Sequence, residues 1–193
     1  MKKHWSIILV CLCWVSLVLN FLLLDNYLNE KNKYDPYRDW TEYSVKLRLD
    51  KERDIFADYA EYLTKIMNNT GSIDDLANYA RAVTEFSSPE IVGGAVNQRE
   101  EEHKELGSLL TDILAAGAVV YPNIEKIAAF DNDSLQQMRQ IYADLHYLLN
   151  ANNEENSFTF YLQSNDFTSE ASRDVQNKIK EKLAQLNELL EIK

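Results

Sequence analysis

The chain opens with an unbroken apolar run and continues with apolar residues spaced three and four apart. The run covers residues 5–24, WSIILVCLCWVSLVLNFLLL, twenty residues without a charged side chain. A helix rises about 1.5 Å per residue, so this length reaches about 30 Å, the thickness of a bilayer's hydrocarbon core. The pattern predicts a single transmembrane helix at residues 5–24.

The flank of the run distinguishes a retained anchor from a cleaved signal. A secretory signal has an apolar core of about 7–15 residues that ends in small residues at the cleavage site. Here the first alanine is Ala57 and the first glycine is Gly71. We therefore expect no cleavage and a permanent anchor.

Charges on either side of the run indicate its orientation. Lys2 and Lys3 precede it, whereas DNYLNE follows it with two acids and no base before Lys31. Cytoplasmic flanks are enriched in Lys and Arg. We expect a cytoplasmic tail at residues 1–4 and an extracytoplasmic remainder, in a single-pass protein of the cell membrane.

We expect a juxtamembrane stalk at residues 25–39, and the residues after it show the apolar spacing of helices. Apolar residues recur at threes and fours between breaks rich in Gly, Pro, Asn and Asp. Such breaks join antiparallel neighbours when they are short. The predicted fold class is all-α, with an N-terminal transmembrane helix followed by an antiparallel bundle of five or six helices over residues 40–193. The helices are expected at about 40–67, 72–87, 90–120, 122–130, 131–151 and 169–192.

Local signals fix several predicted boundaries. In the first bundle helix, the charged residues 51–54 interrupt an apolar stripe, and Gly71 is expected to cap its end. Ser72 and Asp131 are expected to cap the starts of later helices. Residues 157–162 alternate apolar and polar, as strands do, but a strand there would have no partner, so we predict a short helix or an irregular segment.

Charge and cysteine content narrow the classes of partner. Residue 24 is followed by 18 basic and 31 acidic side chains, a formal charge of −13. Such a surface repels nucleic acid and favours basic proteins, cations or neutral glycans. Both cysteines, Cys11 and Cys13, lie in the predicted span, so the exported part has no disulfide. This composition favours the outer face of a bacterial cytoplasmic membrane.

One face of the predicted span carries small and polar residues. Ser6, Cys13 and Asn20 are spaced by sevens, and Ser16 lies between the last two. Such faces let membrane helices approach and hydrogen-bond, so this is a candidate contact with a partner span or a second copy. The alternative is that these side chains are ordinary filler in a membrane helix.

A second candidate surface lies in the long third helix. Arg99 and His103 fall on the apolar rhythm of that helix, and Glu100 precedes His103 by three residues. They are a candidate polar pocket or partner surface. The alternative is a solvated stretch of helix, and a metal site is disfavoured because a diiron bundle needs a second Glu-x-x-His and two further glutamates.

The third candidate is a connection rich in asparagine and aromatic residues. Long polar connections with exposed aromatic side chains often serve recognition. The alternative is that the aromatic rings cover the bundle. The residues concerned are Phe158, Phe160, Tyr161 and Phe167.

No nucleophile elbow, phosphate loop or zinc-binding spacing occurs in the sequence. We therefore predict no catalytic residue, metal or cofactor, and favour a non-enzyme. The function expected is a membrane-anchored extracytoplasmic interaction or accessory module that binds another protein or a second copy of itself. The alternatives are a helical domain that binds a small molecule or cell-wall glycan, and an envelope hydrolase without a recognisable motif.

Overall fold

The structure is a computed structural model that describes residues 20, 23–24, 45–86, 101–164 and 169–192. The chain divides into two compact units, residues 1–43 and 44–193, and each is considered by itself. All regular elements within the described ranges are helices, and these ranges contain no strand. The all-α class expected from the sequence is therefore confirmed.

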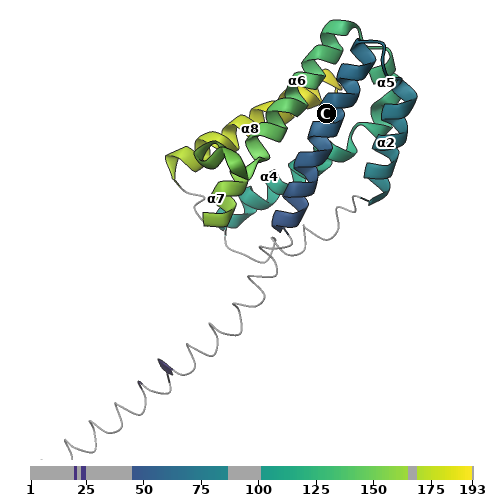
Figure 1. Ribbon diagram of the computed structural model, residues 1–193. Coiled ribbons are helices and arrows are strands. Elements are labelled where there is room, and N and C mark those ends of the chain that lie inside the picture. Colours follow the sequence, from purple (N-terminus) through teal and green to yellow (C-terminus); the bar gives the residue numbers. More distant parts are fainter. Residues whose placement is uncertain (1–19, 21–22, 25–44, 87–100, 165–168, 193) are drawn as a thin grey trace, which may run out of the picture. The chain divides into compact units, whose positions relative to one another are not determined.

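Seven α-helices are present in the described part of the second unit, which is a helical bundle (Figure 1). The first occupies residues 45–67 and carries no label in the figure. Two short 3-10 helices, η1 (Tyr121–Asn123) and η2 (Ala151–Asn156), lie in the connections. The remaining α-helices are α2 (Ile73–Phe86), α4 (Glu101–Ala118), α5 (Ile124–Ala128), α6 (Asn132–Leu149), α7 (Phe158–Ser164) and α8 (Glu170–Leu189).

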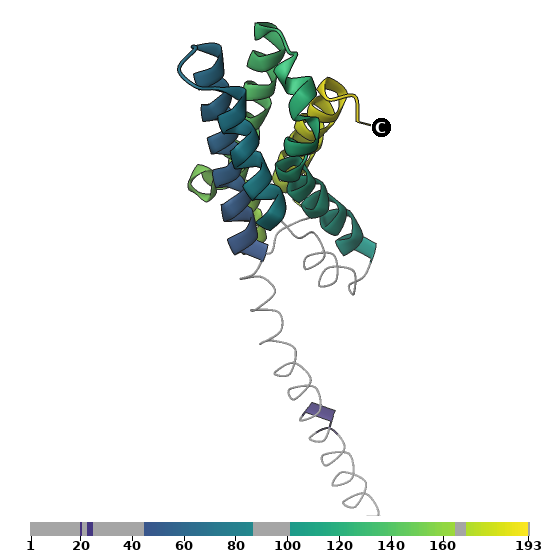
Figure 2. The same ribbon diagram turned by 90° about the vertical axis from the view of Figure 1, so that its right-hand side faces the viewer.

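The 45–67 helix lies between α2 and α6, and α8 runs along the outer side of α6 (Figures 1 and 2). The helix α4 contacts both α2 and α8. A short turn at residues 68–72 makes α2 antiparallel to the 45–67 helix. This arrangement brings the end of α4 against the middle of the 45–67 helix.

The core consists of the apolar stripes that the sequence predicts. Burying these stripes supplies the main driving force for packing the helices, because apolar area leaves water. The buried apolar residues at this spacing along α6, α8 and the C-cap of α8 are Leu135, Met138, Ile141, Leu145, Leu148, Val175, Ile179, Leu183, Leu186 and Leu190.

Two predicted helix starts are confirmed by side-chain caps. The Ser72 hydroxyl accepts a hydrogen bond from the Asp75 backbone N–H at 3.2 Å, and the Asp75 carboxylate accepts one from the Ser72 N–H at 3.1 Å. The Asp131 carboxylate accepts from the Ser134 N–H at 2.8 Å. These bonds satisfy N–H groups that have no partner within the first helical turn.

The end of the 45–67 helix corrects the prediction for Gly71. The residue in the left-handed region is Asn69, with φ of 56°, and no described glycine has a positive φ. Asparagine adopts this region more readily than most side chains. A Cβ on Gly71 would lie 2.8 Å from the Cβ of Lys65, so glycine is needed there for close approach.

No single helix in the described residues is long and apolar enough to cross a membrane. The segments Glu105–Ala118 and Tyr121–Ala128, bent by 50°, pass that test only as a pair, by length and composition. The predicted span at residues 5–24 lies outside the described residues except for Asn20, Leu23 and Leu24, which are helical and exposed. The predicted stalk at 25–39 lies outside them entirely.

Candidate functional site

A buried carboxyl group, that of Glu52, lies in the middle of the bundle. Glu52 is only 1% exposed. It continues the stripe of Leu49, Phe56 and Tyr59, which are buried as well. Glu52 follows Leu49 by three residues and precedes Phe56 by four, and Tyr59 follows three residues later. The prediction that residues 51–54 interrupt this stripe is therefore wrong at Glu52, because the helical rhythm places its side chain inward with the apolar residues.

The carboxyl group lies directly against the last turn of α4. A Cβ built on Gly117 would overlap the Oε2 atom of Glu52. Any side chain at residue 117 would therefore displace the carboxyl group or part the two helices. Gly117 is the residue type that lets α4 approach the 45–67 helix at this point.

Two tyrosine hydroxyls cap the end of α4 at the same place. The Tyr59 hydroxyl donates to the Gly117 carbonyl at 2.8 Å, and the Tyr142 hydroxyl donates to the Ala116 carbonyl at 3.1 Å. The last four carbonyls of a helix have no partner within the helix. Tyr59 of the 45–67 helix and Tyr142 of α6 therefore supply hydrogen-bond donors to two of these carbonyls. We call Glu52, Tyr59, Tyr142, Ala116 and Gly117 the carboxyl-tyrosine cluster.

The cluster gives the Glu52 carboxyl group few means of carrying a charge. Its Oε2 atom is buried without a hydrogen-bond partner. The C-terminal end of a helix carries a partial negative charge, and the last turn of α4 has no basic side chain. Both features favour the neutral carboxyl group over the carboxylate.

Burial raises the pKa of Glu52 to about 7, although Lys51 and Arg48 act to lower it. The pKa of Tyr59 is raised by burial, by Tyr79 and by Glu52. The pKa of Tyr142 is likewise raised by burial, by Tyr59 and by Glu52. Both phenols therefore remain protonated at physiological pH, so their hydroxyls can donate to the end of α4 whenever the helices are in contact.

Aromatic contacts hold the cluster in place. The Tyr59 ring lies 5.1 Å from the Tyr142 ring and 5.5 Å from the Tyr79 ring, centroid to centroid. The Tyr79 hydroxyl donates to the Asp58 carboxylate at 2.5 Å. These contacts fix the 45–67 helix against α6 and α2, and each ring pair of this kind adds about 0.5–1.5 kcal/mol beyond burial.

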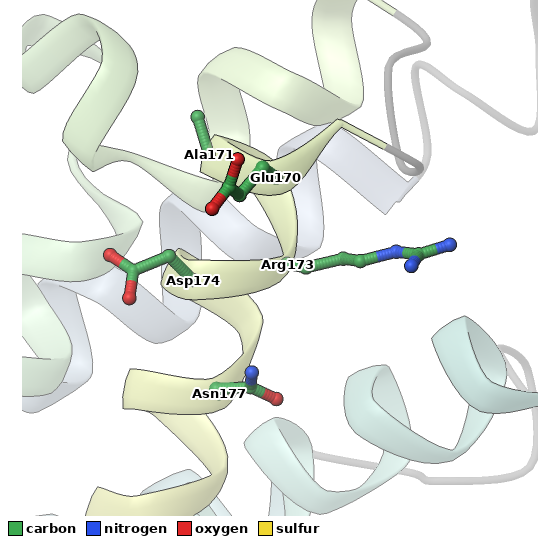
Figure 3. A pocket seen from close by; sticks show the side chains of 5 residues that line it. All are labelled: Glu170, Ala171, Arg173, Asp174 and Asn177. Carbon is green, nitrogen blue, oxygen red and sulfur yellow. The ribbon is translucent and has the colours of Figure 1, made fainter.

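A hollow on the surface lies at the start of α8 (Figure 3). Its lining side chains diverge: Arg173 and Asp174 point to opposite sides of the helix. Binding sites bring polar groups together on one ligand. The hollow is therefore a shallow feature of the surface and not a convergent site. It is lined by Glu170, Ala171, Arg173, Asp174 and Asn177.

The candidate contact face of the span and the candidate polar pocket fall mainly beyond the described ranges. Asn20 is helical and exposed, and the backbone at His103 is part of α4. The remaining members lie outside the described residues, so both hypotheses stay predictions. Those members are Ser6, Cys13, Ser16, Arg99 and Glu100.

The structure describes three of the four aromatic residues in the candidate recognition segment. Phe158 is fully buried, Tyr161 is buried with its hydroxyl donating to the Glu155 carbonyl at 3.0 Å, and Phe160 is half-buried. Phe167 lies outside the described residues. Phe158 and Tyr161 are thus packing residues of α7, as in the alternative given above. A recognition role for the segment as a whole stays a prediction.

The described residues contain no group of three or more His, Cys, Asp or Glu side chains arranged to hold a metal ion. Comparison with models of known protein families, with curated proteins and with solved structures finds no match. Sequence reasoning missed Glu52 because its neighbours are charged, although the spacing of four and three residues placed it on the core face.

Proposed function

We propose that the protein is a membrane-anchored, extracytoplasmic helical module that binds another protein at the cell envelope. The observation that carries the proposal is the uncharged run at residues 5–24, preceded by two lysines and followed by acidic and aromatic residues. A run of this length and flanking charge is what a single retained span needs.

Charge is the second support, and it indicates the chemistry of the partner. The residues after the run carry a formal charge of −13. Complementary charge raises association rates and suppresses wrong partners. A partner with a basic face is therefore favoured, and tethering in the membrane concentrates the bundle near any such partner that is itself membrane-bound.

Photo-cross-linking in native membranes tests the proposal. A photoreactive amino acid is placed at one exposed position on each of four helices: Leu47, Asp74, Tyr147 and Lys180. If the bundle binds a defined protein, irradiation gives a discrete product from the positions on one face and none from those on another. Full-length monomer alone at all four positions would argue against an interaction module.

The identity of the product then separates the two kinds of partner. A product of twice the monomer mass that contains only this chain indicates self-association. A heavier or lighter product identifies a different protein by mass spectrometry. Non-irradiated membranes of each variant serve as the control for aggregation.

A further inference from the structure

We infer that Glu52 makes the contact between the 45–67 helix and the end of α4 responsive to protons: the contact closes over the protonated carboxyl group and loosens when that group ionises. The inference concerns the bundle alone and does not depend on the membrane anchor. It adds a regulatory property to the module proposed above.

The geometry around Glu52 accommodates a neutral group and not a charged one. Its Oε2 atom has no hydrogen-bond partner, and it rests on the backbone of Gly117 in the last turn of α4. The hydroxyls of Tyr59 and Tyr142 donate instead to the carbonyls at the end of α4. An ionised carboxylate in this position would lack the donors that a buried charge requires.

Titratable groups approach Glu52 from its own helix and from two others. Lys51 and Arg48 act to lower the pKa of Glu52, but burial has the larger effect and raises that pKa to about 7. From α4 the cluster receives the backbone of Ala116 and Gly117. Among the described residues, these groups are Arg48, Lys51 and Tyr59 on the 45–67 helix, Tyr79 on α2 and Tyr142 on α6. His146 of α6 contacts the carbonyl of Arg53, the residue after Glu52, at 3.1 Å.

Ionisation has one route to relief, which is access to water. Glu52 reaches water when the 45–67 helix and the last turn of α4 move apart. The same movement breaks the hydrogen bonds from Tyr59 and Tyr142 to the α4 carbonyls. Loosening should therefore appear first in the amides of the last turn of α4, and not uniformly over the bundle.

The experiment compares the full-length chain in detergent with two glutamine variants. Glu52→Gln keeps the shape of the side chain and removes its charge. Glu61→Gln makes the same change on the same helix, where the carboxylate is exposed and pairs with Lys65 at 2.6 Å. Thermal unfolding and amide hydrogen exchange are measured from about pH 5.5 to pH 8.5, and variants are compared at equal pH because intrinsic exchange rates depend on pH.

The wild type and Glu61→Gln should lose about 5–10 °C of melting temperature as the pH rises through about 7, and their last turn of α4 should exchange faster than that of Glu52→Gln at the highest pH. The Glu52→Gln melting temperature should change little over this range. Each variant differs from the wild type in one carboxyl group alone, so the comparison isolates the charge at residue 52 from that at residue 61. An undiminished fall in Glu52→Gln, or no fall in the wild type, would overturn the inference.

Infrared spectroscopy of the wild type covers the case in which Glu52→Gln does not fold. The difference spectrum between about pH 6 and pH 8 should show the loss of one protonated carboxyl band, with a midpoint near 7. Exposed carboxyl groups are already ionised over this range. A spectrum without that band would show that the protonation state of Glu52 does not change over this range, and the inference would then fail.

Discussion

At the scale of single residues, Glu52 and Gly117 depend on each other. A glutamate occupies a position in an otherwise apolar stripe, and the facing residue has no side chain. The spacing of Glu52 relative to Leu49 and Phe56 in the sequence is that of one helix face. The sequence does not predict that Gly117 faces Glu52, because no local pattern shows that residue 117 lies opposite residue 52.

Gly117→Ala tests this dependence, because its effect on the unfolding free energy should change sign when Glu52 is absent. In the wild type the new Cβ overlaps Glu52 Oε2, so we expect a loss of about 1–3 kcal/mol of unfolding free energy. In a Glu52→Ala background the nearest remaining side-chain atom is Ile55 Cγ2 at 3.8 Å, an ordinary contact. There the higher helix propensity of alanine should add about 0.5–1 kcal/mol. Chemical denaturation of the four proteins in this double-mutant cycle measures both effects.

Equal losses in the two backgrounds would show that Gly117 is needed for another reason than the carboxyl group. The single variant Glu52→Ala measures the cost of the cavity that removing the Glu52 side chain leaves.

Tyr142→Phe tests the side-chain cap on α4. The change removes the hydroxyl that donates to the Ala116 carbonyl at 3.1 Å and leaves a buried acceptor unpaired. We expect a loss of about 1–3 kcal/mol in unfolding free energy. Tyr147→Phe, on the same helix with the side chain 51% exposed, is the matched control and should change stability by less than about 0.5 kcal/mol. Similar effects of the two changes would contradict the capping role.

At the scale of elements, helix starts and core stripes could be predicted from the sequence, whereas the cap of the first helix could not. Residues 157–162 were predicted only as a short helix or an irregular segment, and the structure has the short helix α7 there. Caps such as Ser72 use local hydrogen bonds that a sequence pattern reveals. The prediction that Gly71 caps the first helix was wrong, because glycine occurs both at left-handed turns and at close approaches of the backbone. The structure shows that Gly71 is at a close approach and that Asn69 has the positive φ. The alternation at 157–162 resembled a strand, but Phe158 and Tyr161, three residues apart, both face the core, as a helix allows.

Phe158→Ala tests whether α7 is a packing element. Phe158 is fully buried, so its removal should cost about 3–5 kcal/mol of unfolding free energy. Tyr147→Ala removes an aromatic ring of similar size from an exposed site and should cost much less. Denaturant midpoints report both values. A small loss for Phe158→Ala would instead favour an aromatic ring that serves recognition.

At the scale of the whole molecule, two sets of carboxyl groups shape the dependence of stability on pH. The hydrogen bonds from the Ser72 and Ser134 groups lower the pKa values of Asp75 and Asp131. Their stabilisation is present above the unfolded pKa values and is lost as the pH falls. Glu52 acts in the opposite sense, since its folded pKa is raised from 4.5 to about 7.

The stabilisation from Glu52 is therefore complete below about pH 4.5 and is lost as the pH rises through about 7. At about 1.4 kcal/mol per pKa unit, the loss amounts to about 3 kcal/mol. Unfolding free energies measured in urea should thus be highest between about pH 4 and pH 5 and lower on both sides. A steady increase in stability from pH 6 to pH 9 would contradict this profile.

The proposed function requires the anchor at residues 5–24, and labelling of intact cells tests whether the bundle is held outside the cell by it. Lys180→Cys introduces an exposed thiol on α8, while the wild type, whose two cysteines lie in the predicted span, serves as the unlabelled control. A membrane-impermeant maleimide is applied to intact cells, and the membrane fraction is analysed by intact mass. We predict a labelled, full-length chain that stays in the membrane fraction. Labelling only after lysis, or a shortened chain in the medium that begins beyond Leu24, would contradict the account.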